Sequence, residues 1–133
     1  MRPICRNLSH RTGFAEGDAW VVTTADHWAD HIIHGPYDRG RWGTGNKQAV
    51  FRMLVDVTNA NNDKVLTIDV YDGQDVLARR DVYRHEFSGP GQYTNFSMDF
   101  NIAPDKINRP MEVRAWWFDN FYVKVENVTV RNR

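Results

Sequence analysis

The chain alternates apolar and polar residues over most of its length, and this period of two constrains the fold more than any other feature. In the stretch VFRMLVDV, Phe51, Met53 and Val55 lie on one side of the pattern, and Arg52 and Asp56 lie on the other. Successive side chains of a strand point to opposite faces, so the pattern places the apolar residues on one buried face. The stretches VLTIDVYD, YTNFSMDFNI and MEVRAWWF repeat it, and no stretch carries a long, capped helical period. We therefore expect an all-β protein.

Turn-forming sequences separate the alternating stretches. NANND, YDGQD, SGPGQ and APDKINRP combine Gly, Pro, Asn and Asp, which are the residues that tight turns favour. Together with shorter strands at residues 20–23 and 32–37, the pattern gives about eight strands, with a turn roughly every ten residues. An antiparallel β-sandwich of the jelly-roll type closes that number of strands over one core, and we predict this architecture without a strand order.

The chain has the size and composition of one globular domain. Its 133 residues are 41% apolar and 13% aromatic, which suits a buried core and argues against disorder. Residues 1–19 lack a sustained period and are predicted to form an N-terminal arm, which leaves residues 20–133 as the single β-sandwich domain. No apolar run reaches the length of a membrane span, and no hydrophobic region of a signal peptide follows Met1.

The charge balance weighs against one class of partner. Lys+Arg and Asp+Glu both number 17, so the chain has no excess of positive charge that would attract nucleic acid. We expect neither a nucleic-acid nor a membrane partner. The single Cys5 permits no internal disulfide and leaves the cellular compartment unknown.

Catalytic and transition-metal sites lack support in the sequence. His27, His31 and His34 would share a face only if their segment were helical, but Gly35–Pro36 follows at once and the segment reads as extended. Carboxylates gather at turns, where Asp is ordinary, and no serine lies in a nucleophile-elbow sequence. We predict a protein that is not an enzyme, with no catalytic residues and no cofactor.

The segment HIIHGPYDRGRWGTG, residues 31–45, carries large aromatic residues among four glycines. Turns normally use small polar residues, so Tyr37 and Trp42 either fold back under the core or are held out for a partner. The permissive glycines beside Trp42 favour an exposed ring. In RAWWF, alternation sends Trp116 and Trp117 to opposite faces, so Trp116 is either exposed or covered by the N-terminal arm.

Several stretches carry a resemblance through their order along the chain: GPY at 35–37, QAVFRMLVDV, LTIDVYDGQDVLARRDV, YTNFSMDFNI, MEVRAWW and the closing VKVENVTV. In that order they resemble the galactose-binding-like β-sandwich domains, the jelly rolls that include many carbohydrate-binding modules. The resemblance runs from Trp20 to Val130. It implies a non-catalytic, lectin-like module with a carbohydrate ligand, extracellular and often attached to an enzyme in a larger chain.

The resemblance also implies a place for the ligand. These domains often hold it at one rim of the sandwich, which is where the loop HGPYDRGRWGTG is expected. Tyr37 and Trp42 would then stack on the sugar, while Arg114 and Trp116 would lie either near them or on the face of a sheet. The predicted ligand-binding residues are His34, Tyr37, Asp38, Arg39, Arg41, Trp42, Arg114 and Trp116.

A structural calcium ion is common among the proteins that the chain resembles, held by acidic residues near the two termini. Here Glu16 and Asp18 would serve at one end, and the last strand offers Glu126 and Asn127 where an Asp is common. The chain also has Asp119–Asn120 where many relatives carry a glycine after the Arg-x-Trp element. These departures leave calcium and the identity of the ligand open.

A second interpretation stays open beside carbohydrate binding. The surplus aromatic residues could form a protein-interaction or self-assembly surface, because large exposed apolar patches often mark interfaces. A domain of that kind would form a homo-oligomer, or hold another protein, through its aromatic patch.

Overall fold

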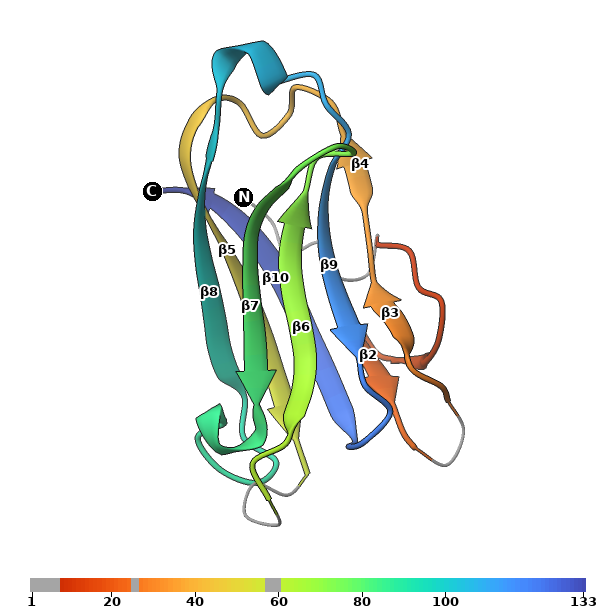
Figure 1. Cartoon of the computed structure of the whole chain (residues 1–133). Helices are drawn as coiled ribbons and strands as arrows, with labels where there is room; N and C mark the ends of the chain where they lie inside the picture. The colour runs from red at the N-terminus through yellow and green to blue at the C-terminus, as the bar shows by residue number, and fades with distance from the viewer. Residues whose placement is uncertain (1–7, 25–26, 57–60) are drawn as a thin grey trace.

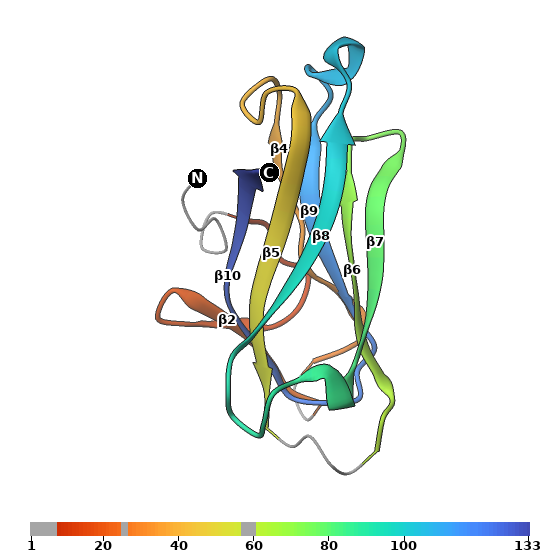
Figure 2. The ribbon, with the colours of Figure 1, turned by 90° about the vertical axis from the view of Figure 1, so that its left-hand side faces the viewer.

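The chain folds into two antiparallel sheets that pack face to face, as the front view (Figure 1) and the side view (Figure 2) show. The structure is a computed structural model that describes residues 8–24, 27–56 and 61–133. The first sheet has the order β1 (Phe14–Glu16), β2 (Ala19–Val22), β10 (Val123–Asn132), β5 (Gly45–Val55) and β8 (Thr94–Ile102). The second sheet has the order β3 (Asp30–Ile33), β9 (Met111–Trp117), β6 (Lys64–Tyr71) and β7 (Val76–Tyr83), with β4 (Pro36–Asp38) also paired to β9.

The predicted all-β antiparallel sandwich is confirmed, with ten strands in the described residues where the sequence predicts about eight. The extra strands are short: β1 has three residues, and the predicted strand at 32–37 is divided into β3 and β4. The division falls at Gly35, whose φ of +109° breaks the extended path. The short 3-10 helices η2 (Arg84–Glu86) and η3 (Pro104–Lys106) lie in connections. Within the described chain, no helix is long and apolar enough to cross a membrane.

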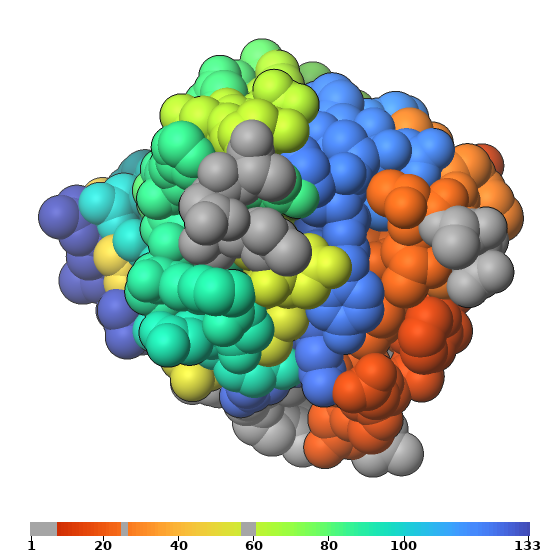
Figure 3. Space-filling model, turned by 90° about the horizontal axis from the view of Figure 1, so that it is seen from below, coloured from red at the N-terminus to blue at the C-terminus, as the bar shows by residue number. Residues whose placement is uncertain are grey.

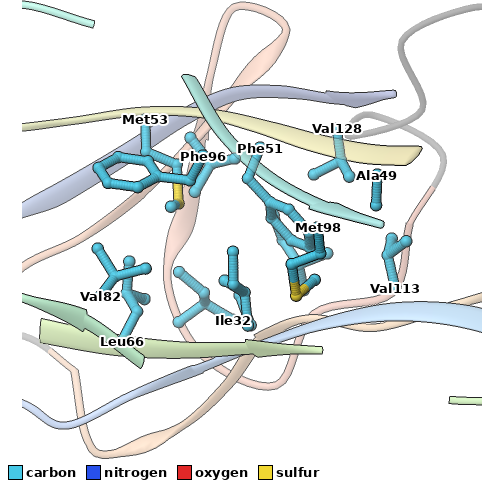
Figure 4. Close-up of a cluster of buried hydrophobic side chains, with 14 of the residues drawn as sticks. Ile32, Ala49, Phe51, Met53, Leu66, Val82, Phe96, Met98, Val113 and Val128 are labelled. Carbon is cyan, nitrogen blue, oxygen red and sulfur yellow. The ribbon is translucent and has the colours of Figure 1, made fainter. Parts of the chain in front are cut away.

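The core lies between the sheets and is built from the apolar side of the period-two pattern. Phe51 and Met53 of β5 are fully buried, as are Leu66 of β6 and Val113 of β9. Figure 4 shows these side chains meeting from the two layers. Because the inward positions alternate with outward ones, each central strand also presents a second row of side chains on the outside of the sandwich.

The described part of the predicted N-terminal arm belongs to the sheets. Phe14–Glu16 forms β1, which pairs with β2, and Ser9 makes a bridge to His34 at the edge of the second sheet. Leu8 is buried in the core. Cys5 lies outside the described residues.

Candidate functional site

The outward side of the second sheet gathers polar and aromatic side chains. In β9, Val113, Ala115 and Trp117 are fully buried, so the alternate residues Arg114 and Trp116 point away from the core. The same alternation applies to β6, where Leu66, Ile68 and Val70 point inward. This side of the sheet faces the viewer in Figure 1. We call the group at its β3–β9–β6 part the outer-face cluster, made of His31, His34, Tyr37, Asp69, Tyr71, Glu112, Arg114 and Trp116.

Strand register brings these residues together. In the β6–β9 pair, Asp69 is opposite Arg114 and Tyr71 is opposite Glu112. In the β3–β9 pair, His31 is opposite Trp116. Directly opposed side chains on one face of an antiparallel pair lie within contact distance. The cluster therefore follows from pairing between strands that are far apart in the sequence.

An ion pair between Arg114 and Asp69 forms the polar centre of the cluster. Arg114 donates two hydrogen bonds to the Asp69 carboxylate, from Nε and Nη2, and each is 2.7 Å long. The guanidinium also lies over the Tyr71 ring, with Cζ 4.1 Å from its centroid. The hydrogen bonds to Asp69 raise the pKa of Arg114, and burial opposes that effect. A two-bonded pair of this kind holds both side chains in one orientation.

Glu112 is a buried carboxylic acid beside this pair. Its residue is only 7% exposed, although it lies on the outward row of β9. Burial raises the pKa of Glu112, because a desolvated carboxylate is disfavoured, and the charge of Asp69 raises it further. The positive charge of Arg114 and a hydrogen bond from the Gly35 backbone act in the opposite direction.

Aromatic rings border the polar centre on the β3 and β4 side. His31 meets Trp116 edge to face, with ring centroids 5.0 Å apart. Tyr37 is 45% exposed, and its hydroxyl lies 2.5 Å from Nδ1 of His34. The φ of Tyr37 is +68°, in the left-handed region that a bulky residue rarely adopts. Such strain is retained where surrounding contacts impose it, and it is enriched at functional sites.

Burial sets the ionisation of these aromatic residues. It lowers the pKa values of His31 and His34, and the charge of Arg114 lowers the pKa of His31 further. Burial also raises the pKa of Tyr37. The outer-face cluster therefore favours neutral rings around one internally paired charge.

Trp42 lies apart from this cluster, and the prediction that its ring is exposed is wrong. The residue is 5% exposed and packs in the core, with its ring centroid 6.0 Å from that of Phe100. The glycines beside Trp42 help to bury its ring, whereas the sequence analysis expects them to leave it exposed. Gly40 and Gly43 adopt positive φ, and this lets the loop fold back over the end of the core. The Gly40 amide donates to Ile107 O at 2.8 Å, and this hydrogen bond holds the loop in that conformation.

The other residues of the predicted rim site lie in or beside the same loop. Arg39 donates to Asn108 O at 3.0 Å, Asp38 pairs with Met111 of β9, and Arg41 is exposed. Arg39 also lines a polar pocket of about 410 Å³ at this end of the sandwich, together with Asp72, Gly73, Gln74, Asp105, Asn108, Arg109 and Pro110. Of the eight predicted ligand-binding residues, the outer-face cluster brings together His34, Tyr37, Arg114 and Trp116.

His31, Asp69, Tyr71 and Glu112 complete the cluster and are not among the predicted ligand-binding residues. Alternation alone would have placed Asp69 and Tyr71 on the polar face of their strand. It carries no information on which strand lies beside β6, because strand pairing is non-local. The full cluster could be predicted only from the strand order, which the sequence does not supply.

The residues predicted to hold calcium make protein contacts in this structure. Glu16 pairs with Lys124 at 2.6 Å, and Glu126 pairs with Arg52 at 3.4 Å and accepts from Asn127 at 3.4 Å. The described residues contain no group of three or more His, Cys, Asp and Glu side chains that could hold a metal ion. A calcium site that also uses backbone oxygens stays a prediction.

Comparison with known proteins identifies the fold. No family profile and no curated protein sequence matches the chain. A solved structure described as "CBM4 structure and function" aligns with 97% of this chain and 80% of its own, at 11% identity and a TM-score of 0.53. A carbohydrate-binding module of the CBM6 type from Cellvibrio mixtus lichenase 5A, in complex with cellotriose, aligns with 95% of this chain and 87% of its own, at 11% identity and a TM-score of 0.49. The chain has the β-sandwich fold found in carbohydrate-binding modules.

Proposed function

We propose that the chain is a non-catalytic carbohydrate-binding module whose ligand lies on the outer-face cluster. The observation that carries the proposal is the combination of Trp116, Tyr37 and Tyr71 with a fixed Asp69–Arg114 pair on one side of one sheet. Sugar rings have apolar C–H faces that stack on aromatic rings, and their hydroxyls need polar partners at fixed positions. The cluster offers both.

The charges of the cluster favour a neutral glycan. The Arg114 guanidinium is committed to Asp69 by two hydrogen bonds, so it is not a free cation for a carboxylated or sulfated sugar. Burial lowers the pKa values of His31 and His34, which keeps those rings from supplying positive charge near neutral pH. The same two hydrogen bonds pair the Asp69 carboxylate, so this ion pair offers an anionic sugar no net positive charge to bind.

Binding measurements on a panel of neutral oligosaccharides test the proposal. The panel should contain gluco-, xylo-, manno- and galacto-oligosaccharides, titrated by calorimetry against the wild type and Trp116→Ala. Loss of a stacking ring should weaken association by about 1–3 kcal/mol, roughly 5- to 150-fold. Tyr93→Ala is the matched control, because Tyr93 lies against Arg52 of the first sheet, away from the cluster. It should leave affinity unchanged.

Two outcomes would count against the proposal. Absence of binding to every member of the panel would contradict carbohydrate recognition. Equal loss of affinity in Trp116→Ala and Tyr93→Ala would contradict the assignment of the outer-face cluster. A concentration-dependent dimer that Trp116→Ala disrupts would instead favour the self-assembly interpretation.

A further inference from the structure

A second pocket lies at the edge of the sandwich where β2 of the first sheet approaches β3 of the second. It has a volume of about 490 Å³ and is formed by the segment beside β1, by β2 and by the residues that precede β3. Figure 3 shows the red and orange N-terminal segments at this side of the molecule. We call it the edge pocket, and its lining residues are His10, Arg11, Thr12, Gly13, Trp20, His27 and Trp28. None of them belongs to the outer-face cluster.

Trp28 is an oriented, exposed ring at this pocket. It is 55% exposed, the highest value among the large apolar residues that the structure describes. Its indole Nε1 donates to Asp30 Oδ2 at 3.3 Å, and Arg11 Nε lies 3.2 Å from the same oxygen. Asp30 therefore fixes the ring from one edge and leaves most of its surface in water. An indole held in this way is a stacking platform that packing within the chain does not use.

Two histidines line the same pocket and carry complementary polar atoms. His10 stacks on Trp20, with centroids 3.5 Å apart, and its Nδ1 must donate to Ile32 O at 2.7 Å because a carbonyl oxygen only accepts. Burial lowers the pKa of His10, which favours the neutral ring and leaves Nε2 as an acceptor. His27 is the reverse case: its Nδ1 accepts from the Thr23 amide at 2.9 Å, so its Nε2 carries the proton and donates.

A buried hydroxyl adds a third polar group. Thr12 is buried at the pocket wall, and its Oγ1 has no hydrogen-bond partner among the described residues. Buried polar groups are nearly always paired, so an unpaired one calls for an explanation such as a bound ligand or a water molecule. A ligand hydroxyl that reached Thr12 Oγ1, after a change of the side-chain rotamer, would supply the missing partner.

The charges at the pocket balance. Arg11 pairs with Asp30, which leaves no net charge from this pair for an ionic ligand. The pocket offers an acceptor on His10, a donor on His27 and the unpaired hydroxyl of Thr12, all beside the exposed indole of Trp28. Neighbouring hydroxyls of a sugar ring match this set, because each sugar hydroxyl both donates and accepts. The volume lies in the ordinary range of small-ligand pockets, about 300–1,000 Å³.

We infer that the edge pocket is a second carbohydrate-binding site, which takes a neutral sugar ring stacked on Trp28. The chain would then hold glycan at two places, the outer-face cluster and the edge pocket. The inference rests on the proposed function for its class of ligand and goes beyond it in assigning a separate site.

Indole NMR signals separate the two sites. Protein labelled with ¹⁵N in its tryptophans gives one Nε1–H signal per ring, assigned with single Trp→Phe variants, and is titrated with the same neutral oligosaccharides. We expect the Trp28 signal to move in a saturable way in both the wild type and Trp116→Ala, with dissociation constants that agree within about twofold, as for independent sites. In the Trp116→Ala background, Trp28→Ala should weaken the remaining binding by about tenfold or more, while Phe118→Ala should not.

The outcomes distinguish failure of this inference from failure of the proposed function. If the Trp116 signal moves and the Trp28 signal does not, the second site is wrong and the outer-face proposal stands. If the Trp28 signal moves only when Trp116 is intact, the edge pocket is not an independent site and the inference is overturned. If no indole signal moves with any sugar of the panel, both proposals fail.

Discussion

At the scale of single residues, Tyr37 and Trp42 lie in opposite environments. Both are large aromatic residues in one glycine-rich segment, and the sequence gives both the same two alternatives. The structure holds Tyr37 out, 45% exposed, and buries Trp42 beside Phe100. The loop that carries Trp42 is held by a contact across the chain, the hydrogen bond from Gly40 to Ile107, which no local signal encodes. Sequence reasoning could identify the segment but not the direction of each ring.

The burial of Trp42 predicts a large stability effect. Trp42→Ala removes a buried indole from the core and leaves a cavity, so it should lower the free energy of unfolding by about 3–5 kcal/mol. Trp28→Ala is the matched control, because its exposed ring should cost less than about 1 kcal/mol. Urea denaturation of the two variants measures both values. A cost for Trp42→Ala as small as that of Trp28→Ala would show that the ring is not part of the core.

At the scale of strands, length decided what could be predicted. The long strands β5, β6, β8 and β9 alternate over seven or more residues, and their apolar faces are the core that the sequence predicts. The three-residue strands β1 and β4 are too short to show a period. The outer-face cluster needs the β6–β9 and β3–β9 pairings, which depend on the whole fold. The sequence could therefore place Trp116 on an outward row but could not name its neighbours.

The connection into β1 gives a prediction at this scale. Gly13 has a φ of +98°, and a Cβ built on it would lie 2.4 Å from Trp20 Nε1 and 2.7 Å from Val21 O. Gly17, in the β1–β2 turn, also has a positive φ of +62° but meets nothing within 4 Å. Gly17→Ala should therefore lower the free energy of unfolding only by the cost of a left-handed conformation for alanine, about 1–2 kcal/mol. Gly13→Ala should lower it clearly more, because its Cβ would also clash with β2. It should also displace Trp20 from His10.

Thermal melts and the near-UV circular dichroism of the indoles measure the two effects. The expected result is a larger drop in melting temperature for Gly13→Ala, together with a changed indole signal. Equal melting temperatures for the two variants would mean that the segment before β1 can move away from β2 without loss, which would also weaken the case for the edge pocket.

At the scale of the whole molecule, the sandwich places its apolar core and a row of polar and aromatic side chains on opposite faces of the second sheet. The inward rows of both sheets hold the apolar core, and the outward row of the second sheet is left to carry polar and aromatic groups. The same packing partly buries titratable groups at that row and at the edge pocket: burial lowers the pKa values of His10, His31 and His34 and raises that of Glu112. The free energy of unfolding should therefore change with pH in a defined direction.

The histidines and Glu112 contribute with opposite signs to the pH dependence of the free energy of unfolding. A histidine whose pKa is lowered by folding stabilises the native state above its unfolded value of about 6.5, and that stability is lost as pH falls through the lowered pKa. A carboxyl whose pKa is raised, such as Glu112, contributes stability below its unfolded value of about 4.5, which is lost as pH rises through the folded pKa. Between about pH 7.5 and pH 5.5, the three histidines together should outweigh Glu112, so stability should fall on acidification.

Chemical denaturation at the two pH values checks the sign. The free energy of unfolding should be lower near pH 5.5 than near pH 7.5, and His31→Gln should reduce that difference because it removes one of the titrating rings. His31 is a suitable choice because its ring contacts Trp116 edge to face at the outer-face cluster. Val76→Ala, a change at an exposed position without a titratable group, should leave the difference unchanged. Stability that rises on acidification, or that changes equally in the two variants, would show that burial of His31 does not govern the response of the native state to protons.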